Sequence, residues 1–189
     1  MPRSAMLRSV PVVASIVAAL LLAVGPAAAK DVSRTIYVPE GWEGAYEFGY
    51  APVLRVGETV IVSGVPAGGD GTYEEKIRGM YTRVRELLET AGATIDDVVE
   101  LTTFHAEPKD SAAFRAEFER YMPIHREFFG EHRPAWTAVG TTALLSRTAP
   151  VEMRVVAVVG SGRASRVVRG EPETKPSEAG KPEEGGSPP

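Results

Sequence analysis

Residues 73–92 read YEEKIRGMYTRVRELLETAG, and this stretch decides the fold. From Tyr73 to Ala91 an apolar side chain recurs every three or four residues, and most positions between them are charged. Such spacing gathers the apolar side chains into one stripe along an amphipathic helix. Gly92 stands where a helix of this length needs a C-terminal cap. The stretch therefore predicts one helix packed by a single face onto a core.

Short strands are expected on the N-terminal side of this helix. Residues 35–38 form a β-like run, and residues 53–62 alternate around Gly57, which predicts two strands joined by a tight turn. Residues 63–71 are rich in Gly and Pro and should break the second strand. The aromatic, glycine-containing stretch 40–50 is predicted to be an ordered loop, with a short extended segment as the alternative.

A strand, a second helix and two further strands are expected on the C-terminal side. Residues 97–106 are rich in β-branched side chains, and Asp110 or Ser111 can cap a helix after them. Pro123 should kink or divide that helix because it removes a backbone donor. The aromatic residues of this helix are expected to pack in the core: Phe114, Phe118, Tyr121 and Phe128. Residues 136–144 and 151–159 are predicted to close the domain as a hairpin.

The resulting order is β-β-β-α-β-α-β-β. It predicts an α+β fold with a mixed sheet and two main helices on one face.

Both ends of the chain lie outside this predicted domain. Residues 1–29 have basic residues, an apolar run and a small-residue site after Ala29, which is typical of a secretory signal peptide. An uncleaved N-terminal anchor is the alternative. Residues 162–189 are rich in Pro, Gly and Glu and poor in large apolar side chains, so they are expected to be a disordered tail. One domain over residues 30–161 remains.

Composition limits the chemistry and the partners. The chain has no cysteine, so disulfides, thiolate metal sites and cysteine nucleophiles are excluded. Without Arg3 and Arg8, the 21 basic residues become 19 against 25 acidic ones, a net charge of −6. This net negative charge gives no electrostatic attraction for the phosphates of a nucleic acid, so no nucleic-acid partner is expected. We expect a periplasmic or secreted protein with no stable membrane insertion once the signal is cleaved.

Three ordered stretches resemble the Rid (YjgF-type) family. They are GYAPVLRVG at 49–57 running into VSG at 62–64, LLETAGA at 87–93 followed by DVV at 97–99, and RPAWTAV at 133–139 followed by VEMRVVAV at 151–158. The resemblance covers roughly residues 45–160. It implies a chorismate-mutase-like fold assembled as a homotrimer with a barrel-like core. It also implies inter-subunit clefts that hydrolyse small imines or enamines without a metal or organic cofactor.

The resemblance also points to site residues and to two departures. Tyr50 matches the cleft tyrosine of the family, and Ser63 and Gly64 match its cleft-lining Ser-Gly. The arginine that holds a substrate carboxylate in the deaminating branch is replaced by Trp136. The glutamate that assists the water is replaced by Arg154, two residues after Glu152.

Two interpretations of these departures stay open. Side chains two residues apart on a strand share a face, so Glu152 and Arg154 point the same way. If Trp136 lies on a neighbouring strand, Arg154 could anchor an anionic ligand while Trp136 forms a wall or a cation–π partner. Alternatively, Trp136 fills the cleft and Arg154 makes a structural ion pair with Glu152 or another acid.

Other candidate residues have simpler interpretations. His105, His125 and His132 lack the spacing of common metal sites, so surface or capping roles are expected and no metal is predicted. Arg133 either reaches the cleft mouth or is an exposed arginine. The acidic, aromatic stretch before Tyr50 either covers the cleft or is a solvated loop.

Two functional classes follow. The first is a hydrolase or deaminase acting on a small imine, enamine or related C–N compound, with Tyr50, Glu152 and Arg154 as catalytic candidates and Tyr50, Ser63, Gly64, Trp136 and Arg133 as binding candidates. The second is a non-catalytic trimer that binds a small molecule or another protein. Ribonuclease action is disfavoured by the net charge and by the absence of paired histidines.

Overall fold

The computed structural model describes residues 33–170. The predicted signal peptide, residues 1–29, and most of the predicted tail lie outside them. Within the described part, residues 164–170 follow the last helical turn without helix or strand. No helix of residues 33–170 combines the length and the apolar character needed to cross a bilayer.

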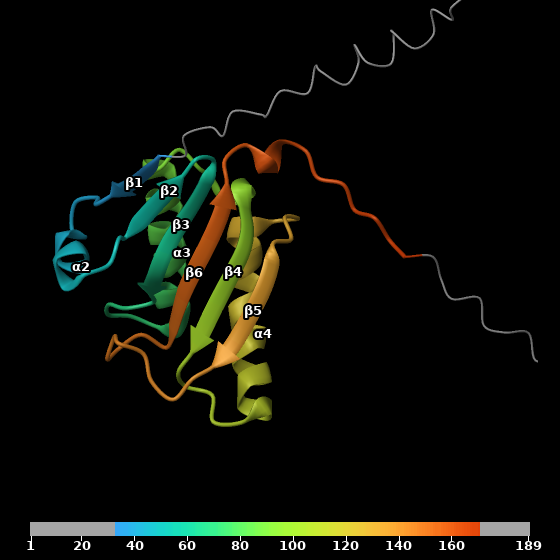
Figure 1. Cartoon of the computed structure of the whole chain (residues 1–189). Coiled ribbons are helices and arrows are strands. Elements are labelled where there is room, and N and C mark those ends of the chain that lie inside the picture. Colours follow the sequence, from blue (N-terminus) through green and yellow to red (C-terminus); the bar gives the residue numbers. More distant parts are fainter. Residues whose placement is uncertain (1–32, 171–189) are drawn as a thin grey trace, which may run out of the picture.

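A six-stranded sheet forms one layer and two long helices form the other (Figure 1). The strands are β1 (Arg34–Tyr37), β2 (Val53–Val56), β3 (Thr59–Pro66), β4 (Val98–His105), β5 (Ala135–Gly140) and β6 (Val151–Val158). Their order in the sheet is β1-β2-β3-β6-β4-β5, with only β4 and β5 parallel. The helices α3 (Tyr73–Thr90) and α4 (Ser111–Phe129) both cover the same face. The predicted α+β class with two helices on one face is confirmed.

The helix predicted from residues 73–92 is α3, and its ends follow from local chemistry. Thr72 and Glu75 form a capping box at the start. After Thr90 the chain turns at Gly92, whose φ of 80° lies in the left-handed region that favours glycine. The predicted stripe is buried against β3 and β6: Ile77, Met80, Tyr81, Val84, Leu87 and Leu88.

The predicted hairpin of the last two strands is wrong. β6 lies between β3 and β4 and is antiparallel to both, while β5 runs parallel to β4 at the sheet edge. The helix α4 is the crossover between β4 and β5, which makes a parallel pair. The two apolar stretches are adjacent in the sequence, but the long connection 141–150 takes the chain past β4 before β6 begins.

Two smaller predictions are also corrected. Residues 43–48 form a short helix, α2 (Glu43–Phe48), inside the stretch predicted to be a loop. The helix α4 is a single element through Pro123, so the predicted division is wrong. Pro123 and Glu119 are both exposed, so the carbonyl that loses its donor faces water on the outer side of the helix.

The break predicted from residue 63 is a bulge within a strand. β3 continues to Pro66, and its register against β6 shifts between Val62 and Val65. Ser63 and Gly64 therefore lie in an irregular segment beside the start of β6. Bulges of this kind re-aim side chains and are common beside functional sites.

Candidate functional site

Four of the residues predicted from the sequence line one hollow. Its volume is about 510 Å³, and its lining consists of Tyr50, Ser63, Gly64, Pro66, Leu145, Ser146 and Glu152. We call this site the Glu152 hollow. It lies where β3 ends and β6 begins, beside the segment that leaves α2 and beside the connection 141–150. The sheet brings Tyr50, Ser63, Gly64 and Glu152 together from three separate parts of the sequence.

The carboxylate of Glu152 lies directly over Gly64. A Cβ atom added at Gly64 would collide with Oε1 of Glu152, so only glycine leaves room for this carboxylate. Pro66 is the register partner of Glu152 on β3, which fixes the strand backbone beneath it. Partial burial raises the pKa of Glu152 above its ordinary value. Within residues 33–170 this carboxylate has no hydrogen-bond or ion-pair partner.

The other polar groups of the hollow are fixed to different degrees. The hydroxyl of Ser63 donates to the carbonyl of Ala51 at 2.7 Å, and the backbone N–H of Ser63 donates to Pro52 at 3.0 Å. These bonds hold the segment that carries Tyr50 against the bulge. Tyr50 is 38% exposed, and its ring packs edge-on against Phe48 at 6.4 Å between centroids.

Arg154 does not line the Glu152 hollow. It points, like Glu152, to the helix-free face of the sheet, but its guanidinium pairs with Glu100 of β4 at 3.3 Å. Both side chains are substantially exposed, at 40% and 53%. Of the two interpretations of Arg154, the ion pair with another acid matches the geometry of the chain.

Trp136 points to the opposite face of the sheet. In the parallel register it lies beside the buried Leu101, and its ring packs on Phe118 and His125 of α4 at 5.0 and 4.5 Å. Its strand is separated from β6 by β4. The hypothesis that Trp136 and Arg154 face each other across one cleft is therefore wrong within the chain. Trp136 fills the space between helix and sheet.

Arg133 also lies away from the Glu152 hollow. It precedes β5, at the end of the sheet where β4 begins, and β6 begins at the opposite end because it is antiparallel to β4. Its guanidinium donates to the carbonyls of Gly130 and His132 and pairs with Glu131. Arg133 is therefore an exposed arginine, the second of the two interpretations, and does not reach the hollow.

A second group of polar side chains was missed by the sequence reasoning, and we call it the Glu117 network. His105 lies between Thr103 at 2.9 Å and Glu117 at 3.1 Å. Glu117 also accepts from Tyr73 at 2.8 Å, and Trp136 donates to Thr103 at 3.1 Å. These partners assign the tautomer: Nδ1–H of His105 donates to the carboxylate, and Nε2 accepts from Thr103.

The surface role predicted for the histidines is wrong for two of them. His105 is fully buried and His125 is 5% exposed. Burial, then the nearby Arg133, Arg126 and His132, lower the pKa of His125 to about 4. Spacing along the sequence gave no signal for these contacts, because each histidine meets partners from another element.

Comparisons with known proteins agree with the fold and extend over most of the domain. The family model described as Endoribonuclease L-PSP matches residues 45–159. The RutC family protein YjgH of Escherichia coli is 34% identical over 120 residues, covering 60% of this chain and 87% of that protein. The crystal structure of Rv2704 from Mycobacterium tuberculosis, a member of the YjgF/YER057c/UK114 family, has a TM-score of 0.58 at 30% identity.

That structure is covered completely and accounts for 67% of this chain. A solved structure of protein YjgH gives a TM-score of 0.58 at 29% identity, with 68% of this chain and 98% of that one covered. Fold, matched range and ordered motifs agree, and the chain belongs to the Rid (YjgF-type) family.

Proposed function

We propose that this protein is a hydrolase of small imines or enamines and that the Glu152 hollow is its reaction site. The observation that carries the proposal is the convergence of Tyr50, Ser63, Gly64 and Glu152 on one hollow. Three of these residues stand at the cleft positions of the family, and the fourth supplies a carboxylate. Membership of the family supports a small-molecule or deaminase-type role.

The chemistry requires water to attack the carbon of a C=N bond. A carboxylate accepts a proton from the water as the C–O bond forms, then returns a proton to the nitrogen so that ammonia leaves when the C–N bond breaks. Glu152 has the required freedom because no partner within residues 33–170 engages it. Its raised pKa brings it closer to neutral pH, where a group that both accepts and returns protons works best.

Assembly as a homotrimer is part of the proposal. Among residues 33–170, no helix covers the face of the sheet opposite α3 and α4 (Figure 1). The strand registers place eight large apolar side chains on it: Ile36, Leu54, Val56, Ile61, Phe104, Val139, Val156 and Val158. A largely apolar face without a covering layer is typical of a subunit interface. Light scattering after size-exclusion chromatography measures the mass, and a monomeric value would contradict the trimer.

Export is proposed from residues 1–29. The mass of the protein recovered from the periplasm or the medium tests it. Cleavage after Ala29 gives a chain that begins at Lys30. Retention of residues 1–29 would support the membrane anchor.

The hydrolase is tested with imines generated in situ. An amine or amino-acid oxidase supplies the imine, semicarbazide competes for it, and a hydrolase lowers the yield of semicarbazone. General acid–base groups contribute about 10²–10⁴-fold, so Glu152→Gln should lose about a hundredfold or more of the activity. Absence of activity with every imine, in a folded and trimeric preparation, would contradict the proposal.

A non-catalytic binding trimer is the second candidate. It is favoured by two observations: among residues 33–170 no basic side chain lines the Glu152 hollow, and Trp136 stands at the position where the deaminating branch has an arginine. Ligand binding without turnover of any imine would support it. Ribonuclease activity is not proposed, because the net charge is −6 after removal of the signal and because His105 and His125 are buried.

A further inference from the structure

Among the described residues of one subunit, the lining of the Glu152 hollow carries one formal charge, and this charge is negative. Its other polar groups are the hydroxyls of Tyr50, Ser63 and Ser146. The hydroxyl of Ser63 already donates to Ala51. A ligand carboxylate in this hollow would meet the carboxylate of Glu152 without a cation to neutralise either group, and like charges in a partly buried site repel. The lining therefore disfavours anionic ligands.

Three arginines lie on segments next to the hollow, and none of them adds a positive charge to its lining. Arg83 donates from α3 to the carbonyl of Pro66 at 2.7 Å, and its guanidinium lies on the helix side of the sheet. Arg154 pairs with Glu100. Arg147 is exposed in the connection 141–150 and is absent from the lining, although its neighbours Leu145 and Ser146 belong to it.

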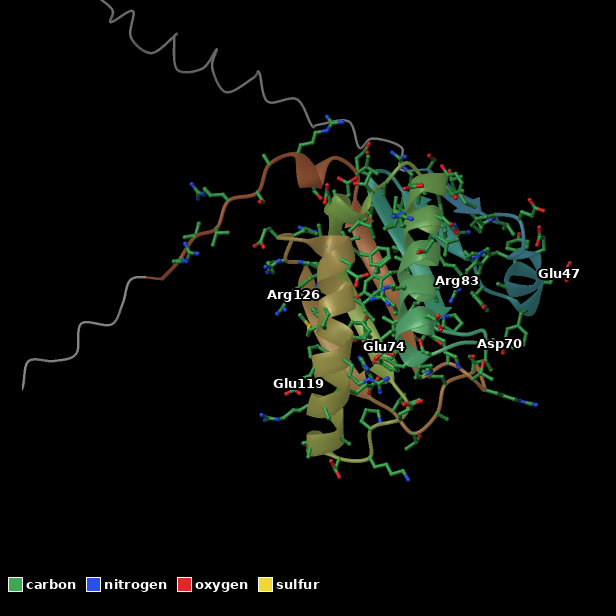
Figure 2. The ribbon with its side chains drawn as sticks, turned by 180° about the vertical axis from the view of Figure 1, so that it is seen from behind. Glu47, Asp70, Glu74, Arg83, Glu119 and Arg126 are labelled. Carbon is green, nitrogen blue, oxygen red and sulfur yellow. The ribbon has the colours of Figure 1, made fainter. Side chains whose placement is uncertain are left out.

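The rim of the hollow is apolar and exposed. Leu145 is 79% exposed, Tyr50 is 38% exposed, and Phe48 beside Tyr50 is 74% exposed. Large apolar side chains at the edge of a concave site usually contact the apolar body of a ligand. An aromatic ring also attracts a cation placed over its face. Glu47 belongs to α2, and Asp70 lies on the same side of the molecule (Figure 2). Both add to the negative field on that side.

We propose that the Glu152 hollow selects a positively charged nitrogen compound with an apolar, preferably aromatic, body and no carboxylate. The inference rests on the proposed function in taking this hollow as the reaction site. The substrate is then an iminium ion rather than a 2-imino acid, and the reaction is R–CH=NH₂⁺ + H₂O → R–CHO + NH₄⁺. Water forms the new C–O bond and gives one proton to Glu152, which passes it to the nitrogen. As the C–N bond breaks, Glu152 takes the second proton from the new hydroxyl group, whose oxygen becomes that of the aldehyde, and this proton joins the departing ammonia to give ammonium.

A matched pair of substrates tests the selectivity. A flavin-dependent amine oxidase acting on 2-phenylethylamine supplies an imine without a carboxylate. An L-amino acid oxidase acting on L-phenylalanine supplies the same aromatic imine with a carboxylate. The protein purified from cells expressing the full chain should hydrolyse the first at least tenfold faster than the second. Faster hydrolysis of the carboxylate-bearing imine would overturn the inference and leave the proposed function intact.

Binding separates the inference from the proposed function. In calorimetric titrations 2-phenylethylamine should bind and 3-phenylpropanoate should not. The variant Glu152→Gln should bind 2-phenylethylamine about tenfold or more weakly, because it removes a charged hydrogen-bond partner of the ligand. The matched control Glu131→Gln removes an acid at the opposite end of the sheet, where it pairs with Arg133 outside the hollow, and should leave the Kd unchanged. Binding of 2-phenylethylamine without hydrolysis of either imine would support the inference and contradict the proposed function. Equal binding by wild type and Glu152→Gln would overturn the inference.

Discussion

The two layers of this molecule each contain a partly or fully buried glutamate, and the two are used in opposite ways. Glu117 is 8% exposed and accepts hydrogen bonds from His105 and Tyr73 between helix and sheet. Glu152 lies at the edge of an open hollow with no partner among residues 33–170. A carboxylate held by hydrogen-bond donors in the interior stabilises the fold. A carboxylate left free beside a hollow remains available to a ligand.

This difference between Glu117 and Glu152 decides which of the two carboxylates is the better candidate for chemistry. Burial and hydrogen bonding alone would single out the Glu117 network, because it contains a histidine and a carboxylate in contact. Its members are enclosed, however, and their donors and acceptors are matched to one another, apart from Oε2 of Glu117, which is buried without a partner in the described part of the chain. Catalytic groups must reach a ligand. We therefore propose that Glu152 takes part in the chemistry and that Glu117 has a structural role.

The largest expected effect comes from Trp136→Arg, which tests whether position 136 belongs to the helix side. The substitution removes ring contacts with Phe118 and His125 and places a guanidinium among aromatic side chains. Loss of a large buried aromatic side chain costs about 3–5 kcal/mol, so we expect about 4 kcal/mol of stability to be lost. Urea denaturation measures it. A stable variant that gains hydrolysis of 2-imino acids would show that position 136 faces a cleft.

Trp136 also marks the limit of what could be predicted from the sequence. The helix 73–92 and the strands around it were predictable because local period and turn residues determine them. Tyr50, Ser63, Gly64 and Glu152 were predictable as a set because ordered motifs carry them. The placement of Trp136 and Arg154 was not, because it depends on which strands are neighbours, and the insertion of β6 between β3 and β4 leaves no local signal.

The second prediction compares the two glutamates directly. Glu117→Ala leaves Tyr73 and His105 without an acceptor, and each unsatisfied buried group costs about 1–3 kcal/mol, so we expect a loss of about 3 kcal/mol. Glu152→Ala removes no hydrogen bond or ion pair among residues 33–170 and should change stability by about 0.5 kcal/mol or less. Urea denaturation of both variants measures the difference. Similar losses for the two would mean that Glu152 also has a structural partner.

The third prediction is a loss of stability in acid that originates on the helix side. The pKa of His125 is about 4 in the folded protein and 6.5 as its ordinary value. Between these two pKa values the unfolded chain therefore binds more protons than the folded protein. The contribution of His125 to the free energy of unfolding is fully present above about pH 6.5 and decreases as the pH falls toward 4. Between pH 7 and pH 5 the loss attributable to this residue is about 2 kcal/mol.

Denaturation midpoints across that range, measured for wild type and for His125→Phe, isolate the contribution. Phenylalanine keeps the stacking on Phe129 and Trp136 but cannot be protonated. It also loses the hydrogen bond with Tyr81, so His125→Phe should be less stable at pH 7 and less sensitive to acid. An unchanged acid sensitivity would assign the loss to other groups.

The last prediction concerns Gly64→Ala, which should change stability little and separates folding from function on the side of the hollow. A methyl group at this position collides with the far end of the Glu152 side chain, which can swing aside into the open hollow. We expect the free energy of unfolding to change by about 1 kcal/mol or less, since the displaced group is flexible. Binding of 2-phenylethylamine should nevertheless weaken at least tenfold, because the carboxylate no longer lies where the ligand nitrogen meets it. Calorimetry at matched protein concentration measures both the affinity and the fraction of competent sites. Unchanged binding would mean that the ligand nitrogen does not contact Glu152, and a large loss of stability would mean that the bulge at Ser63 and Gly64 holds the sheet together rather than shaping the hollow.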